Sequence, residues 1–246
     1  YVNNASVAEE FLFSSLPWID AILGETFTIE SRENKPRRKL YVQGSPLAFE
    51  VSVAESKVSI NGAESGMGIK IKGEYDKDSR FQVYSIERRE ISSKWDIINE
   101  HIGVVDHVNT QKSLIHFIVS RNIDGVIQFS DLDEVFNEGD VIAVRLSQYT
   151  TKKGTHYHVL TAEKTNQAIS ESILKAFDDD VREDSGMGFT SDGIFVPPPM
   201  MRSLNVKNND RVAGLAILNY NKKRAEWGWK AIKINNVTSH TLNELG

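Results

Sequence analysis

The residues best suited to chemistry are aromatic and basic side chains near the C-terminus. The stretch GMGFTSDGIFVPPP, residues 186–199, places Phe189 and Phe195 on either side of a Ser-Asp-Gly turn. If Ile194 and Val196 face the core, strand alternation places Phe195 outside, although both rings could instead fill the core. A ring exposed on a strand can stack on a nucleobase, with a gain of about 1–3 kcal/mol per base. Met187 can also pack on a base, because its thioether is flexible and polarizable. The glycines that flank this methionine weaken a strand, and we interpret them as leaving room for a flat ligand.

A second aromatic and basic cluster follows in the next two predicted strands. Two tryptophans, two residues apart, share one face of a strand and lie close to a basic turn. This arrangement suits a nucleic-acid groove with cation–π contacts. The rings could equally cap a barrel or pack on a neighbouring domain, and the turn could be an ordinary solvated loop. The candidate residues are Tyr220, Lys222, Lys223, Arg224, Trp227, Trp229 and Lys230.

The densest basic cluster lies nearer the N-terminus, between two predicted strands. It contains Lys35, Arg37 and Arg38. These side chains could hold phosphates as point and fork charges. A solubilising loop and a localisation signal are the alternatives.

Signs of catalysis or of a cofactor are few. The sequence has no phosphate-binding loop with a Lys-Ser/Thr pair and no Gly-x-Ser-x-Gly elbow. The acidic run 178–180 is contiguous, so its side chains diverge. His156 and His158 share a strand face, but no third metal ligand is evident. We therefore expect a protein without catalytic residues, metal or cofactor.

Composition limits the class of protein. The 246 residues are 40% hydrophobic and 26% charged, as in ordinary globular domains. A net charge of −5 argues against a generic nucleic-acid binder, although residues 182–233 carry nine Lys or Arg against five acids. The absence of cysteine fits a reducing cytoplasm, and no apolar run is long enough to span a membrane. Because the chain begins without Met or a signal pattern, we expect a piece of a longer protein, whose other domains are possible partners.

Strand-like runs fall into three segments. We predict a β-rich domain at 1–92 with an N-terminal helix interrupted at Pro17, a second at 93–166, a linking helix at 167–180 and a third domain at 181–246. The second and third segments repeat one order of parts at a period of about 80 residues. Five short strands in about 60–70 residues is the size of an OB-type Greek-key barrel. The predicted fold is therefore mostly β, with two tandem five-stranded OB barrels, short linking helices and a divergent third barrel at the N-terminus.

The third segment resembles a cold-shock domain, which is a nucleic-acid-binding form of the OB fold. The cold-shock pattern is Gly-aromatic-Gly-aromatic followed on the next strand by Val-Phe-Val-His-Phe. Here the matching stretches are Gly186-Met187-Gly188-Phe189 and Ile194-Phe195-Val196-Pro197-Pro198. The phrase IFVPPPMM also resembles the cold-shock-like domains that precede the catalytic domain of RNase II-type exoribonucleases.

The second segment is similar at 114–117 and 126–130, so the resemblance implies that His116, Gln128 and Phe129 face a ligand. It implies a partner that is single-stranded nucleic acid, RNA before DNA, bound by stacking and phosphate contacts. The alternatives are a protein-interaction module without nucleic-acid affinity and a domain that senses a nucleotide-like ligand.

Overall fold

The structure is a computed structural model that describes residues 13–29, 35–151, 154–221 and 224–239. The chain divides into two compact units. Unit 1 comprises residues 1–100 and 145–160, and unit 2 comprises residues 101–144 and 161–246. Within the described ranges, no helix has the length and apolar character needed to cross a membrane.

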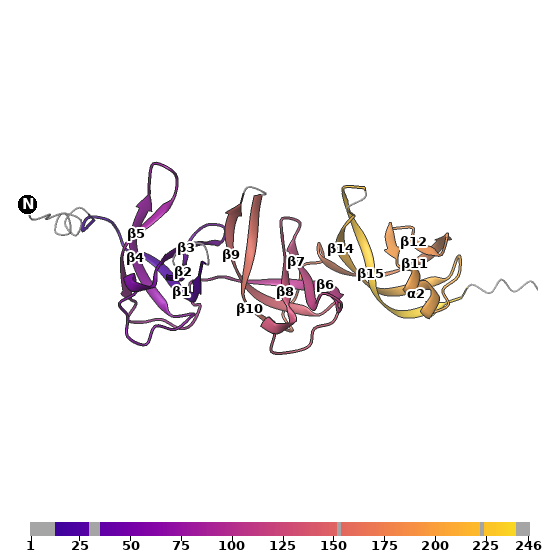
Figure 1. The fold of residues 1–246 in the computed structure, drawn as a ribbon. Helices are drawn as coiled ribbons and strands as arrows, with labels where there is room; N and C mark the ends of the chain where they lie inside the picture. The colour runs from indigo at the N-terminus through magenta and orange to yellow at the C-terminus, as the bar shows by residue number, and fades with distance from the viewer. Residues whose placement is uncertain (1–12, 30–34, 152–153, 222–223, 240–246) are drawn as a thin grey trace, which may run out of the picture. The chain divides into compact units, whose positions relative to one another are not determined.

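Unit 1 is built on five strands in the order β5-β4-β1-β2-β3 (Figure 1). Their core consists of inward aliphatic side chains such as Leu23, Leu40, Ile69 and Ile71, all fully buried. The second half of β9 (Val141–Thr151) adds to the edge of β3 as a parallel neighbour. The five strands are β1 (Ile19–Thr28), β2 (Pro36–Val42), β3 (Ala48–Ala54), β4 (Gly68–Tyr75) and β5 (Phe81–Arg88), with a 3-10 turn, η1 (Glu55–Lys57).

Unit 2 contains a group of strands followed by a closed barrel (Figure 1). The first group is β6 (Glu100–Asn109), β7 (Leu114–Ser120), β8 (Ile123–Gln128), the 3-10 turn η2 (Phe129–Asp131), the start of β9 and the end of β10 (Gly154–Lys164). The barrel order is β11-β12-β13-β15-β14. Its strands are β11 (Leu174–Asp184), β12 (Met187–Thr190), β13 (Ile194–Val196), β14 (Arg211–Asn221) and β15 (Glu226–Thr238), with helix α2 (Pro198–Ser203) after β13.

The same strand pairings recur along the chain. In each run of five strands the first strand pairs with the second and fourth, the second with the third, and the fourth with the fifth. Only in the C-terminal barrel do the described residues also pair the third strand with the fifth, as β13 runs parallel to β15. The repeated order predicted for the second and third segments is thus present in the pairings. The assignment of unit 1 as a third OB domain stays a prediction.

The predicted helices are wrong wherever the structure describes their residues. Residues 13–15 form a turn and β1 begins at Ile19, while residues 11 and 12 of the predicted helix lie outside the described ranges. The linking helix is replaced by β11, which begins at Leu174 and pairs with β14 over its first seven residues. In this strand Phe177 and Val181 point into the barrel core. The C-terminal barrel therefore begins at Leu174, seven residues before the predicted boundary.

The glycines around Met187 serve the fold, so our interpretation of them as room for a ligand is wrong. Ser185 and Gly186 have φ values of +54° and +80°. Two left-handed residues in succession make the two-residue hairpin between β11 and β12, where glycine avoids the steric penalty. Gly188 faces inward, and a Cβ there would lie 2.6 Å from Met201 Sδ and 2.9 Å from Val181 Cγ1. Each glycine therefore has a local structural cause.

Gly188→Ala is expected to lower the free energy of unfolding of the barrel by about 1–3 kcal/mol, because an added methyl overpacks a filled core. Gly228→Ala is the matched control, since a Cβ at Gly228 would meet nothing within 4 Å. Urea unfolding of both variants measures the difference. Equal stability of the two variants would contradict the tight packing of Gly188.

Candidate nucleic-acid interface

Four side chains form a row across the outer face of the C-terminal barrel, which we call the phenylalanine row. Neighbours in the strand register are Arg182 with Phe189, Phe189 with Phe195, and Phe195 with Lys230. Residues in register on adjacent strands share a face and lie about 4.8 Å apart along the hydrogen-bonding direction. The row therefore places two rings between two cations.

The two rings lie outside the core, as strand alternation predicted. Ile194 and Val196 are fully buried in the barrel core, whereas Phe195 between them is half-buried. Phe189 alternates in the same way between the buried residues Gly188 and Thr190. The ring centroids of Phe189 and Phe195 are 5.6 Å apart, with an angle of 42° between the ring planes. The pair presents a shallow aromatic surface on which a base could stack.

Met187 lies at one end of β12, and its surroundings are acidic. Its register partner on β11 is Asp184, an exposed residue. A carboxylate opposite Met187 disfavours a phosphate at this end of the surface. Stacking by Met187 is accordingly the least supported contact on this face.

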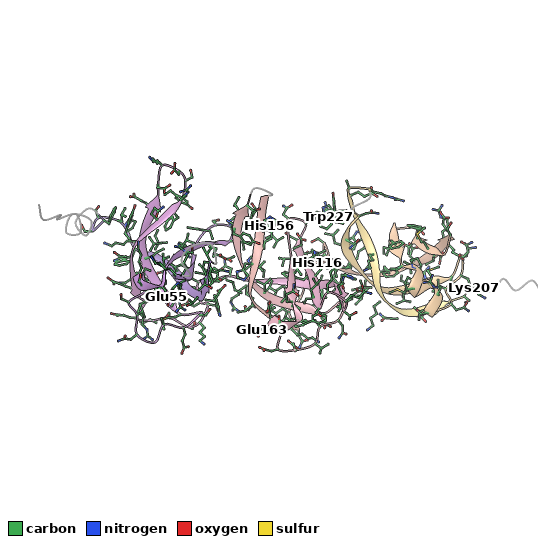
Figure 2. The ribbon with its side chains drawn as sticks, viewed as in Figure 1. Glu55, His116, His156, Glu163, Lys207 and Trp227 are labelled. Atoms are coloured by element: carbon green, nitrogen blue, oxygen red, sulfur yellow. The ribbon has the colours of Figure 1, made fainter. Side chains whose placement is uncertain are left out.

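A cavity of about 660 Å³ gathers other predicted residues from both parts of unit 2. From the first strand group it is lined by His116 on β7, and from the barrel by Tyr220, Trp227 and Lys230 on the last two strands. Figure 2 labels His116 and Trp227. We call it the Trp227 cavity. The sequence placed these residues in separate domains, and the fold brings them to one site.

Aromatic packing shapes one side of the Trp227 cavity. Tyr220 and Trp227 are register partners with ring centroids 5.2 Å apart, and Tyr220 is 42% exposed. Trp227 packs on a hydrophobic cluster that includes the buried residues Val104 and Ile118 of the first strand group. Trp227 therefore packs on the neighbouring strands, as the second interpretation held, and it also lines the cavity.

His116 is a cation held between two carboxylates. Its Nδ1 lies 2.5 Å from Asp106 Oδ1, and its Nε2 lies 2.9 Å from Asp124 Oδ2. Burial alone would lower the pKa of His116, but the hydrogen bonds and charges of the two aspartates outweigh it and raise the pKa to about 9. Asp106 is only 5% exposed, so its charge needs this partner. The ring is therefore an imidazolium at neutral pH, whereas the resemblance implied only that it faces a ligand.

Lys230 links the two surfaces. Its backbone is in register with Phe195, and its Nζ lies 3.8 Å from Glu138 Oε2 and 3.5 Å from the Asp106 carbonyl oxygen. Lys112 also lines the Trp227 cavity. The cavity thus combines cations with the two aspartates that flank His116.

Three further candidates lie in different settings. Trp229 is half-buried against the barrel core, with Lys175 Nζ 4.5 Å from its ring centroid. Gln128 and Phe129 are exposed, and among the described residues that line the Trp227 cavity neither is present. Gln128 is nevertheless the register partner of Leu114, which lines the cavity, so it lies on the same face of this strand group as His116.

The remaining predicted basic residues come from two parts of the sequence, residues 35–38 and 222–224. Arg38 lies in β2 and is held by Glu55, with an N–O distance of 2.7 Å, and Arg37 donates to the Ser52 carbonyl at 2.7 Å. The prediction that this cluster lies between strands is wrong for residues 36–39, because β2 begins at Pro36; Lys35 directly precedes the strand and is exposed. In the C-terminal turn Arg224 is exposed and lies 3.6 Å from Glu226, and Lys222 and Lys223 lie outside the described ranges.

Sequence reasoning missed several residues of the interface. Arg182 gave no signal of its own, because only the strand register shows that it neighbours Phe189. Asp106 and Asp124 lie ten and eight residues from His116, and strand pairing brings them to its two nitrogens. Among the described residues no group of three or more His, Cys, Asp or Glu could hold a metal ion.

Two family models match the chain. S1/CSD-like domain 1 of the TOTE conflict systems matches residues 95–159, and S1/CSD-like domain 2 of these systems matches residues 175–234. Together they cover about half of the chain. The second match begins one residue after the start of β11, in agreement with the corrected barrel boundary.

Two solved structures are similar at low scores. Drosophila Unr CSD456 covers 92% of this chain and 98% of its own, with 10% identity and a TM-score of 0.28. The p204 HINb domain covers 59% of this chain and 96% of its own, with 10% identity and a TM-score of 0.28. The comparison with curated proteins gave no match. On the evidence of the family models, the chain carries two tandem S1/CSD-like domains of the kind described in the TOTE conflict systems.

Proposed function

We propose that the tandem S1/CSD-like domains bind single-stranded nucleic acid, RNA before DNA, as a non-catalytic module of a larger protein. The observation that carries the proposal is the phenylalanine row, in which Phe189 and Phe195 lie side by side between Arg182 and Lys230. A groove that combines stacking rings with cations is the usual means of binding a single strand without sequence preference.

The Trp227 cavity supports the same function at a second point. Lys230 belongs to the phenylalanine row and also lines the cavity, so the two surfaces adjoin at this residue. Tyr220 and Trp227 offer rings there, while Lys112 offers a cation. A strand that crosses the row from Arg182 toward Lys230 could place its next base in the cavity. The preference for RNA is supported by the resemblance to cold-shock-like domains of exoribonucleases.

Salt dependence tests the proposal. Fluorescently labelled oligo-U and oligo-dT are titrated with the chain at low and high salt, with anisotropy as the readout. Affinity is expected to fall with salt, with a slope of log K against log salt of about −0.7 per phosphate contact. Arg182→Ala is expected to make this slope shallower by about one contact, because it removes one cation of the row.

Lys207→Ala is the matched control, since Lys207 is an exposed cation of the same barrel, on the loop before β14 and outside the row. An unchanged slope in Arg182→Ala would remove Arg182 from the interface. Failure of both oligonucleotides to bind at low salt would sink the proposed function.

A second candidate function is a protein-interaction module. It is favoured by Asp184 opposite Met187 and by the net charge of −5, both of which disfavour a polyanion. This function predicts a partner whose affinity depends little on salt. The same titrations therefore separate the two candidates.

A further inference from the structure

Two carboxylates from the described part of the chain line the Trp227 cavity, although a carboxylate repels the phosphates of a strand. They belong to Asp106 and Asp124, and they differ in exposure. The side chain of Asp106 is 7% exposed, whereas that of Asp124 is 54% exposed. Asp124 is therefore the carboxylate that a ligand in the cavity can reach.

Strand register places Asp124 on the wall that the first strand group contributes. His116 on β7 is the register partner of Val126 on β8. Two residues further along β7, Ile118 pairs with Asp124. Alternate residues of a strand share a face, so these four side chains lie on one face, and all four line the cavity. Val126 is 48% exposed and gives this wall an apolar surface beside the carboxylate.

The wall that the barrel contributes offers one ring for stacking. The planes of Tyr220 and Trp227 are tilted by 59°, so a flat base can lie parallel to only one of them. Tyr220 is 42% exposed, whereas Trp227 is half-buried and packs on a hydrophobic cluster of unit 2. The cavity therefore suits one base, stacked on Tyr220, whose polar edge can meet a side chain of the other wall.

His116 positions the carboxylate of Asp124 and does not itself contact a base through a hydrogen bond. An imidazolium has two N–H donors. Both are used, by Asp106 Oδ1 at 2.5 Å and by Asp124 Oδ2 at 2.9 Å. A carboxylate has about four lone-pair sites, so Asp124 can accept further hydrogen bonds while His116 fixes its orientation.

The bases differ in what they offer to a carboxylate. Guanine has two adjacent donors, N1–H and N2–H, on its Watson–Crick edge, and a carboxylate can accept both in a bidentate, charge-assisted pair. In adenine and cytosine the amino group adjoins a ring acceptor, and in uracil the single N–H lies between two carbonyl oxygens. Each of these acceptors would be repelled by the carboxylate, so guanine is the base that fits Asp124 best.

We propose that the Trp227 cavity selects guanine, with the base stacked on Tyr220 and its Watson–Crick edge bound by Asp124. The inference rests on the proposed binding of single-stranded nucleic acid and adds a base preference to it. The phenylalanine row supplies affinity for any sequence, and the cavity discriminates at one nucleotide. A bidentate pair is expected to favour the matching base about tenfold.

Hexamers that differ in a single base test the preference. The reference is an oligo-U hexamer, and guanine replaces uracil at each position in turn, with competition measured by anisotropy. Guanine is expected to tighten binding about tenfold at one position. Inosine at that position lacks the N2 amino group and is expected to lose most of the gain, whereas 7-deazaguanine keeps the Watson–Crick edge and is expected to retain it. Inosine that binds as tightly as guanine would overturn the proposal, because purine stacking would then explain the gain.

Asp124→Asn assigns the preference to the carboxylate. An amide places one donor beside one acceptor, so the ratio of guanine to inosine affinity is expected to fall to about one. Asp133→Asn is the matched control and is expected to keep the ratio, because Asp133 is an exposed carboxylate of unit 2 outside the described lining. Each ratio is taken within one variant, so a change in the folded fraction cancels.

The outcomes distinguish the base preference from strand binding itself. A guanine preference that survives in Asp124→Asn would overturn the role of the cavity, as would hexamers that bind equally well whatever their sequence, and either result leaves strand binding intact. Failure of every hexamer to bind, oligo-U included, would overturn both the preference and the proposed function.

Discussion

Replacing both Phe189 and Phe195 by alanine is expected to weaken oligonucleotide binding about thirtyfold, with the barrel still folded. Loss of stacking costs about 1–3 kcal/mol per base, and a central value of about 2 kcal/mol corresponds to this factor. Both rings lie on the outer face, so their removal leaves the buried residues Ile194 and Val196 in place. We expect the free energy of unfolding to fall by only about 1 kcal/mol, from the lost contact between the rings.

Measurements of both quantities decide the role of the two rings. Anisotropy titrations give the affinity and urea unfolding gives the stability of the double variant. Leu204→Ala is the control, because Leu204 is an exposed apolar residue of the same barrel outside the row. Loss of about 3–5 kcal/mol of stability, typical of a buried phenylalanine, would show that the rings belong to the core.

Unit 2 is expected to lose about 3 kcal/mol of stability between pH 6.5 and pH 9.5 through His116. Its pKa is raised from 6.5 to about 9 in the folded state. A group whose pKa is raised by folding stabilises the folded state. Its full contribution is present at pH values below the pKa of the unfolded state and is lost as the pH rises through the pKa of the folded state. At about 1.4 kcal/mol per pH unit, a shift of this size gives the expected loss.

His116→Gln isolates this contribution, because glutamine keeps a hydrogen-bond donor but does not titrate. The variant is expected to be less stable than the unaltered chain at pH 6.5, and the gap is expected to close by pH 9.5. Urea unfolding across this range measures the gap. A gap that stays constant with pH would mean that the imidazolium is not what holds Asp106 and Asp124 together.

Local alternation was enough to predict the position of Phe195. Ile194 and Val196 are apolar and β-branched, so they were expected in the core, and the residue between them had to face outward. The same alternation places Phe189 on the face opposite Gly188. These predictions needed no information beyond neighbouring residues, which explains why the sequence sufficed for them.

The prediction of a linking helix was wrong because a short apolar pattern does not distinguish a helix from a buried strand. Ile169, Ile173 and Phe177 recur at helical spacing, yet Phe177 lies in β11 and points into the barrel. What decides the outcome is pairing with β14, more than thirty residues away, which no local pattern encodes.

The acidic run 178–180 shows how nonlocal partners determine roles. The prediction that its three side chains diverge is wrong for Asp178 and Asp180, which both approach Arg211, with Asp180 Oδ1 3.9 Å from Arg211 Nη1. Asp178 pairs with Arg211 at 2.9 Å on β14, while Asp179 accepts hydrogen bonds from Ser191 Oγ and the Asp192 backbone N–H. Those hydrogen bonds outweigh burial and lower the pKa of Asp179. Arg38, which we predicted as a candidate phosphate contact, is likewise hydrogen-bonded to Glu55, seventeen residues away in the sequence.

The single ammonium group of Lys230 can contact either oxygen atoms of unit 2 or a phosphate of a bound strand. Within unit 2 that group approaches Glu138 and the Asp106 carbonyl oxygen, whereas a bound strand would draw it toward a phosphate. Binding of a strand therefore replaces contacts of Lys230 within unit 2 by a contact with phosphate. The measured affinity reflects the difference in free energy between the two sets of contacts. Acetylation of Lys230 would remove its charge, and with it both the contact with Glu138 and the contact with a phosphate. A single modification would then lower the stability of unit 2 and its affinity for a nucleic-acid strand together.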